Sequence, residues 1–143
     1  MSAQVMIIIP KYGLPDEAYQ LKYCTVWDVQ KDFPWFPASR IMINKEFKDK
    51  LFNAFTNLEK ANLQGEIKTF DGCFAQRPVR GKSVQSLHCW AMAIDINAAT
   101  EKLAQEKTNF SAQFITIMLA AGLFWGGNWT SRKDSMHFAL YNG

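Results

Sequence analysis

Apolar residues recur at helical spacing in the segment 44–65, which is the clearest pattern along the chain. They fall three or four positions apart and so share one face of a helix: Phe47, Leu51, Ala54, Phe55, Leu58 and Ala61. Asn44 is a suitable N-cap and Gly65 a suitable stop. A second apolar face predicts a helix over residues 108–121, with Gly122 as its stop.

Shorter segments predict strands. Residues 5–9, 67–70 and 91–96 have the length and composition of strands, and residues 136–141 alternate. In this last run one face carries Met136, Phe138 and Leu140, and the other carries His137, Ala139 and Tyr141. Helices and strands do not follow the regular order of parallel βαβ units. The pattern therefore favours an α+β fold, with two main helices packed on a small antiparallel sheet.

Residues 1–40 differ from the rest because they hold four of the chain's five prolines. We expect the strand at 5–9 to be followed there by loops and one hairpin, which wrap the core or border a groove. No repeat, low-complexity tract or Gly/Ser linker divides the chain. We therefore expect a single domain over residues 1–143, with this N-terminal segment beside a main segment at 41–141.

Composition narrows the class of protein. The chain is 48% hydrophobic and 14% aromatic, which suits a packed core and excludes a disordered chain. Its net charge of +3 comes without a basic stripe, so we expect no nucleic-acid partner. We expect no membrane insertion and no signal peptide, because no apolar run is long enough and the start lacks a basic region. Three cysteines without a CxxC pair argue against a disulfide framework.

The two histidines of the chain each have a carboxylate nearby in sequence. His88 precedes Asp95 by seven positions, and Asp134 precedes His137 by three. A carboxylate inside an apolar strand, such as Asp95, is costly unless it is paired or binds a metal. His88, Asp95 and His137 would supply the three protein ligands of a catalytic zinc site, whose fourth position holds water. Asp134 would then take a proton from that water.

A structural interpretation of the same residues is also open at this point. A histidine in an apolar strand is commonly a hydrogen-bonded core residue, and a buried aspartate can accept backbone N–H groups. Spacing alone leaves both interpretations standing. The metal interpretation is favoured because both histidines of the chain have a carboxylate nearby in sequence, at a spacing that zinc chemistry can use.

These residues belong to two motifs that stand in a characteristic order. Residues 86–95 match the pattern Ser-x-His-x-x-Gly-x-Ala-x-Asp except at the glycine, and residues 134–137 match acidic-x-x-His. Phe-Trp-Gly-Gly-Asn-Trp precedes the second motif at 124–129, and a Gly-x-x-x-x-Arg stretch falls within 72–81. In all four features the chain resembles the M15 zinc peptidases, the family of D-alanyl-D-alanine carboxypeptidases and phage L-alanyl-D-glutamate endopeptidases. The resemblance covers residues 41–141.

The resemblance implies an α+β fold with zinc held at the sheet. It implies that His88, Asp95 and His137 are the zinc ligands and that Asp134 is the general base. It also implies that Arg77 stabilises the developing oxyanion or holds the substrate's carbonyl group.

Several neighbouring residues have secondary roles under this hypothesis. Arg80 is the alternative to Arg77, which aligns better with the family motif. Ser86 orients the first motif or touches substrate. Trp129 follows the Gly-Gly turn and is expected to line a substrate groove, whereas Trp125 is equally suited to packing in the core.

The first motif also contains a cysteine next to His88 and an alanine where the family has glycine. Cys89 is expected to pack in the core rather than bind metal, on the expectation that neighbouring strand residues face opposite ways. Ala91 stands where the family has glycine. If that position requires a positive φ, alanine is strained there by roughly 1–2 kcal/mol; if the glycine only permits close packing, a methyl group is tolerated.

The resemblance implies a peptidase acting on bacterial peptidoglycan stem peptides. We expect a monomeric L-alanyl-D-glutamate endopeptidase of the phage endolysin type, held in the host cytoplasm until lysis and then acting on the cell wall. A D-Ala-D-Ala carboxypeptidase or dipeptidase is the alternative within the family. A non-catalytic wall-binding or virion module is the alternative of another class. A zinc storage or sensor protein fits poorly, because such sites favour closed, Cys-rich coordination.

Overall fold

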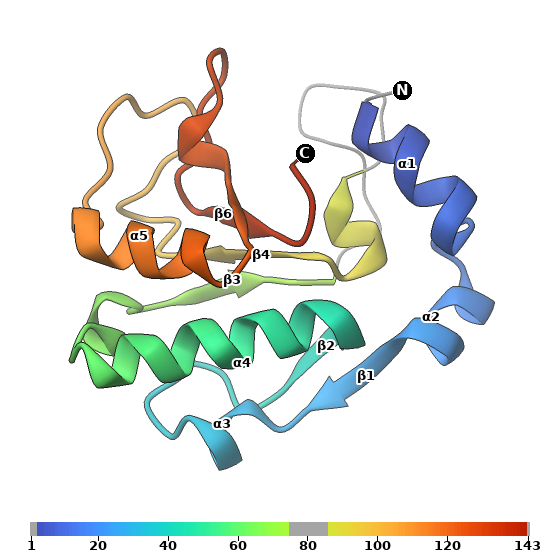
Figure 1. Cartoon of the computed structure of the whole chain (residues 1–143), viewed down its shortest axis with the longest axis horizontal. Coiled ribbons are helices and arrows are strands. Elements are labelled where there is room, and N and C mark those ends of the chain that lie inside the picture. The colour runs from blue at the N-terminus through green and yellow to red at the C-terminus, as the bar shows by residue number, and fades with distance from the viewer. Residues whose placement is uncertain (1–2, 75–85, 143) are drawn as a thin grey trace.

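The computed structural model describes residues 3–74 and 86–142, and it confirms the expected α+β class (Figure 1). Strands form a four-stranded antiparallel sheet in the order β3-β4-β6-β5 and a separate antiparallel pair, β1-β2. The helices described are α1 (Ala3–Tyr12), α2 (Glu17–Tyr23), α3 (Val29–Asp32), α4 (Lys45–Lys60) and α5 (Ala112–Ala120). The strands described are β1 (Cys24–Trp27), β2 (Ile41–Asn44), β3 (Phe70–Gly72), β4 (Ala93–Ile96), β5 (Phe124–Trp125) and β6 (His137–Ala139).

Helices α4 and α5 enclose the main core. In the view of Figure 1, α4 lies between the four-stranded sheet and the β1-β2 pair, and it contacts α5. The ring of Phe114 on α5 meets that of Phe138 on β6 edge to face, with centroids 6.2 Å apart. Both side chains are fully buried. Within the described residues, no helix is long and apolar enough to cross a membrane.

Both predicted main helices are present with shorter bounds. The side chain of Asn44 caps α4 as predicted, accepting a hydrogen bond from the backbone N–H of Phe47. The predicted stop at Gly65 is wrong, because α4 ends at Lys60 and Asn62 already takes the left-handed conformation, with φ 58°. Gly122, with φ 92°, follows the end of α5 as predicted.

The start of α5 is later than predicted because a side chain holds the preceding residues in another conformation. The carboxylate of Glu101 accepts hydrogen bonds from the hydroxyl of Thr108 and from the backbone N–H of Asn109. Ser111 then caps the helix by accepting from the N–H of Phe114. Local side-chain contacts thus replace the first predicted turn.

The predicted strand at 5–9 is wrong, because these residues belong to helix α1. A short apolar run is compatible with a strand or a helix. Ile8 and Tyr12, one helical turn apart, are both buried, as residues on one face of a helix would be. The loops and hairpin expected after the predicted strand within residues 1–40 are also wrong, because helices α2 and α3 lie there. Strand β1 pairs instead with β2, which begins at Ile41, so that Cys24 faces Asn44 and Trp27 faces Ile41.

The three strands expected downstream are present but shorter. The segment predicted at 67–70 joins the sheet only at Phe70, because the side chain of Asn97 accepts hydrogen bonds from the N–H groups of Lys68 and Thr69. Strand β4 begins at Ala93 rather than 91, and β6 covers only 137–139 of the predicted 136–141.

Candidate metal centre

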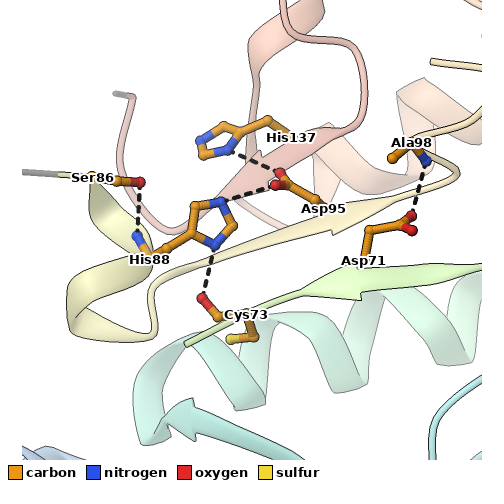
Figure 2. A network of polar contacts seen from close by, with 7 residues as sticks. All are labelled: Asp71, Cys73, Ser86, His88, Asp95, Ala98 and His137. Atoms are coloured by element: carbon orange, nitrogen blue, oxygen red, sulfur yellow. Dashed lines mark hydrogen bonds and ion pairs between the residues drawn. The ribbon is translucent and has the colours of Figure 1, made fainter. Parts of the chain in front are cut away.

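Two of the candidate ligands face each other across neighbouring strands. Asp95 on β4 and His137 on β6 are register partners in the antiparallel ladder. Directly opposite residues in such a pair project from the same face of the sheet. The Nδ1 atom of His137 accordingly lies 3.4 Å from Oδ1 of Asp95 (Figure 2).

The third candidate ligand comes from a tight turn before β4. His88 lies in a 3-10 turn, η2 (Leu87–Trp90), whose N-cap is Ser86. The Ser86 hydroxyl accepts a hydrogen bond from the backbone N–H of His88 at 3.2 Å. Ser86 thus caps the turn that carries His88. Figure 2 shows the His88 ring directed towards Asp95, with Nε2 at 3.3 Å from Oδ2.

A backbone carbonyl fixes the orientation of the His88 ring. Nδ1 of His88 is 2.8 Å from the carbonyl oxygen of Cys73, which can only accept a hydrogen bond. Nδ1 therefore donates a proton to this carbonyl, and Nε2 is the ring nitrogen that faces Asp95 and would bind a metal ion. Ligand histidines in metal sites are commonly oriented by such a contact.

The three side chains are largely shielded from solvent. Exposure is 4% for His88, 6% for His137 and 13% for Asp95. Burial on its own would raise the pKa of Asp95, but hydrogen bonds from His137 and His88 and their charges outweigh it and hold the pKa below its usual range. Asp95 is thus a carboxylate available to a cation.

The donor atoms lie close enough together to bind one metal ion. With zinc–ligand bonds of 2.0–2.1 Å, tetrahedral geometry places neighbouring donors about 3.3–3.4 Å apart. Nε2 of His88 lies 3.3 Å from Oδ2 of Asp95, and Nδ1 of His137 lies 3.4 Å from the other oxygen, Oδ1. One ligand atom from each of the three residues lies within 4.8 Å of the other two. Within the described residues this is the one such group of His, Cys, Asp or Glu. The residues present therefore fit zinc.

The turn that carries His88 ends on a strained residue. Ala91 takes the left-handed conformation, with φ 53° and ψ 37°, and is fully buried. The first of the two alternatives for this position is therefore correct: it requires a positive φ, where glycine is favoured and alanine costs roughly 1–2 kcal/mol. Reversal of the backbone here directs the chain from the turn into β4.

Asp134 lies just before β6 and is braced by the Gly-Gly segment. Its N–H donates to the carbonyl of Gly126 at 3.0 Å, and its own carbonyl accepts from the N–H of His137 at 3.1 Å. A Cβ on Gly126 would lie 2.3 Å from the Asp134 carbonyl oxygen, so only glycine fits. The predicted base is thus tied through backbone bonds to the predicted ligand His137.

The two tryptophans of this region have different environments. Trp129 is half-buried, and its ring centroid lies 5.3 Å from that of His137. Its indole N–H donates to the side chain of Asn142. Trp125 instead stacks on Phe138 and donates to the carbonyl of Ser135, as packing in the core requires.

Three other positions complete the account of the predicted residues. Cys89 is buried as expected, but the strand argument behind that expectation is wrong because the residue lies in the 3-10 turn. Arg77 and Arg80 lie outside the described residues. The Cys73 carbonyl was not predicted, since any residue offers one and no side-chain pattern indicates it.

Comparison with known families bears on the same segment. The model of an M15 peptidase family, described as D-alanyl-D-alanine carboxypeptidase, matches residues 80–140. This segment is similar to the M15 peptidases. The match covers fewer than half of the residues but spans the first motif from His88 to Asp95 and the second from Asp134 to His137. No curated protein matches the chain. At the level of the family, the M15 match indicates a metallopeptidase acting on peptidoglycan.

Proposed function

We propose that this chain is a zinc-dependent peptidase that hydrolyses the stem peptides of bacterial peptidoglycan. The observation that carries the proposal is the buried cluster of His88, Asp95 and His137, whose ligand atoms lie within 4.8 Å of one another. The cluster lies inside the segment that matches the M15 peptidases. Among the described residues, no cysteine belongs to this group, which disfavours a storage site.

Each residue of the centre has a role in this mechanism. His88 through Nε2, Asp95 through its carboxylate and His137 through Nδ1 would hold the ion. Bound zinc would supply a Lewis acid that lowers the pKa of a water molecule in the open position to about 7. The Asp134 carboxylate would take a proton from the attacking water and return it to the leaving amine. Arg77 stabilises the developing oxyanion.

Trp129 forms one wall of the substrate groove in this proposal. Its half-buried ring lies beside the ring of His137, so a peptide reaching the ion passes along the indole face. The hydrogen bond from the indole N–H to Asn142 holds that face in place at 2.9 Å. A flat, partly exposed aromatic surface suits the alkyl parts of a stem peptide.

The scissile bond is the finer part of the proposal. We assign an L-alanyl-D-glutamate endopeptidase of the phage endolysin type, because residues 124–129 resemble the lead-in of the phage subgroup. Such an enzyme acts as a monomer, stays in the host cytoplasm until lysis and then reaches the wall. The description of the matched family favours the second candidate, a D-Ala-D-Ala carboxypeptidase.

Digestion of purified peptidoglycan, read by mass spectrometry for new termini, tests the proposal. Samples with zinc, with a chelator and with Asp134→Asn are compared. New amino groups on D-Glu that vanish with the chelator and in the variant support the endopeptidase. Release of free D-Ala supports the carboxypeptidase. Absence of new termini from folded, zinc-loaded protein on several wall types contradicts both and favours a non-catalytic wall-binding or virion module.

A further inference from the structure

We propose that the N-terminal segment positions the metal centre, and that Tyr19 is its central positioning residue. Tyr19 lies on α2, outside the segment that matches the M15 peptidases. Its hydroxyl reaches the turn that carries His88. The inference rests on the proposed function only in that it assumes a metal bound by His88, Asp95 and His137.

A buried hydrogen-bond chain connects Tyr19 to the turn. The Tyr19 hydroxyl donates to the carbonyl oxygen of Trp90 at 2.5 Å and accepts from the side-chain amide of Asn44 at 3.0 Å. Tyr19, Asn44 and Trp90 are 3%, 1% and 0% exposed. These groups are too deeply buried to hydrogen-bond to water. Removal of the Tyr19 hydroxyl therefore takes away the acceptor of the Asn44 side-chain amide.

Further contacts from the first 44 residues converge on the same turn. The indole N–H of Trp90 donates to the carbonyl of Gly13 at 3.0 Å, and the thiol of Cys24 lies 4.0 Å from the Trp90 carbonyl. The backbone N–H of Asn44 donates to the carbonyl of Ala91 at 3.0 Å. Residues from the end of α1 to the end of β2 thus hydrogen-bond to Trp90 and to the carbonyl of Ala91.

Strain in the turn explains why it needs this support. Ala91 is held in the left-handed conformation, which an alanine leaves unless the surrounding structure fixes it. Tyr19 donates to the carbonyl of Trp90, which precedes the α-carbon of Ala91, and the N–H of Asn44 donates to the carbonyl of Ala91, which follows it. The contacts therefore hold the backbone where it is strained.

The strained residue and the ligand belong to one hydrogen-bonded unit. The N–H of Ala91 donates to the carbonyl of His88 at 3.1 Å, and the N–H of Met92 donates to that of Leu87 at 3.2 Å. A relaxation at Ala91 therefore moves the backbone of His88, and with it the Nε2 atom that faces Asp95. Tyr19 acts on the metal through this unit and not by contact with it.

The test measures zinc affinity, by competition with a chromophoric chelator, in the full chain. Tyr19→Phe removes the hydroxyl and keeps the ring. Tyr23→Phe is the matched control, because its ring stacks on that of Tyr19 at 5.3 Å. We expect Tyr19→Phe to weaken zinc binding about 3- to 10-fold, less than the loss of a direct partner of a ligand, and Tyr23→Phe to leave it within 2-fold.

A second variant separates positioning from general destabilisation. Ala91→Gly relieves the strain, so in that background we expect Tyr19→Phe to weaken zinc binding by less than 2-fold, although the lost hydrogen bond still lowers the melting temperature. If Tyr19→Phe does not fold alone, Trp90→Phe, which removes the bond to Gly13, replaces it in the same cycle.

The outcomes are distinguishable. If the wild-type chain binds zinc and Tyr19→Phe binds it within 2-fold of wild type, the positioning role is overturned and the proposed function stands. An equal loss of affinity with and without Ala91→Gly also overturns it. If the wild-type chain binds no zinc, the metal site itself is overturned, and this inference with it.

Discussion

Gly126 lies against the backbone of Asp134 so closely that a Cβ at position 126 would come within 2.3 Å of the Asp134 carbonyl oxygen. The same carbonyl accepts the N–H of His137. One glycine thus permits the contact that places both the proposed base and a proposed ligand. Glycine is required at position 126 because the Asp134 backbone lies so close, and not because of the conformational freedom of glycine.

Gly126→Ala is therefore expected to displace Asp134 and to lower kcat by at least about 10-fold, since small displacements of catalytic groups are costly. Gly65→Ala is the matched control, because a Cβ there would meet nothing within 4 Å. Steady-state kinetics on a peptidoglycan fragment measure the effect. Equal kcat in the two variants would contradict the positioning of Asp134 by Gly126.

Asp134→Asn is expected to remove general-base catalysis while keeping the shape of the side chain. We predict a fall in kcat of about 10²- to 10⁴-fold with zinc affinity within about 3-fold of wild type. Asp71→Asn is a suitable control, because Asp71 is an exposed carboxylate on β3 that accepts from the N–H of Ala98 (Figure 2). A variant that kept more than a tenth of the activity would assign the base elsewhere.

Ala91→Gly is expected to stabilise the protein, because glycine adopts a positive φ without strain. Part of the gain is offset by the greater freedom of glycine in the unfolded chain, which leaves about 0.5–1 kcal/mol and a rise in Tm of about 1–4 °C. Calorimetry of the metal-free protein measures it. Ala93→Gly in strand β4 should lower Tm instead. A destabilised Ala91→Gly would show that the methyl group contributes more by packing than its strain costs.

The buried thiols make stability depend on alkaline pH. Burial raises the pKa of the Cys24 thiol, and burial raises that of the Cys73 thiol well above its usual value. A group whose folded pKa is raised contributes stability that is present below the unfolded value, about 8.5, and is lost as pH rises towards the folded value.

Urea unfolding between pH 7 and 10 is therefore expected to give a free energy of unfolding that declines above about pH 8.5. Cys24→Ala should reduce that decline. In the native state at pH 8, the two thiols should react slowly with a thiol reagent and then fully in denaturant. Rapid native-state labelling of Cys24 and Cys73 would contradict their burial.

The candidate ligands could be predicted from sequence because their chemistry is rare in this chain. The chain has two histidines, and each lies in a motif with a carboxylate. The structure brings His88 and His137 to the same carboxylate, Asp95. Helix α4 was predictable for a similar reason, since its periodic apolar face and its cap at Asn44 agree.

Other features depended on contacts that sequence does not encode locally. The run at 5–9 fits a strand or a helix equally, and only the packing of Ile8 and Tyr12 against the core decides for α1. The Cys73 carbonyl that orients His88 could belong to any residue. The contact between Tyr19 and Trp90 joins positions 71 residues apart.

The most direct test of a zinc-dependent peptidase is to titrate metal-free protein with zinc. The quantity measured at each step is the rate at which new termini appear in peptidoglycan. We expect no activity without metal and a linear rise in the rate that stops at one zinc per chain. His88→Ala should show no rise over the same range. Full activity in the metal-free protein, or none in protein shown to hold one zinc, would contradict the assignment of a zinc peptidase.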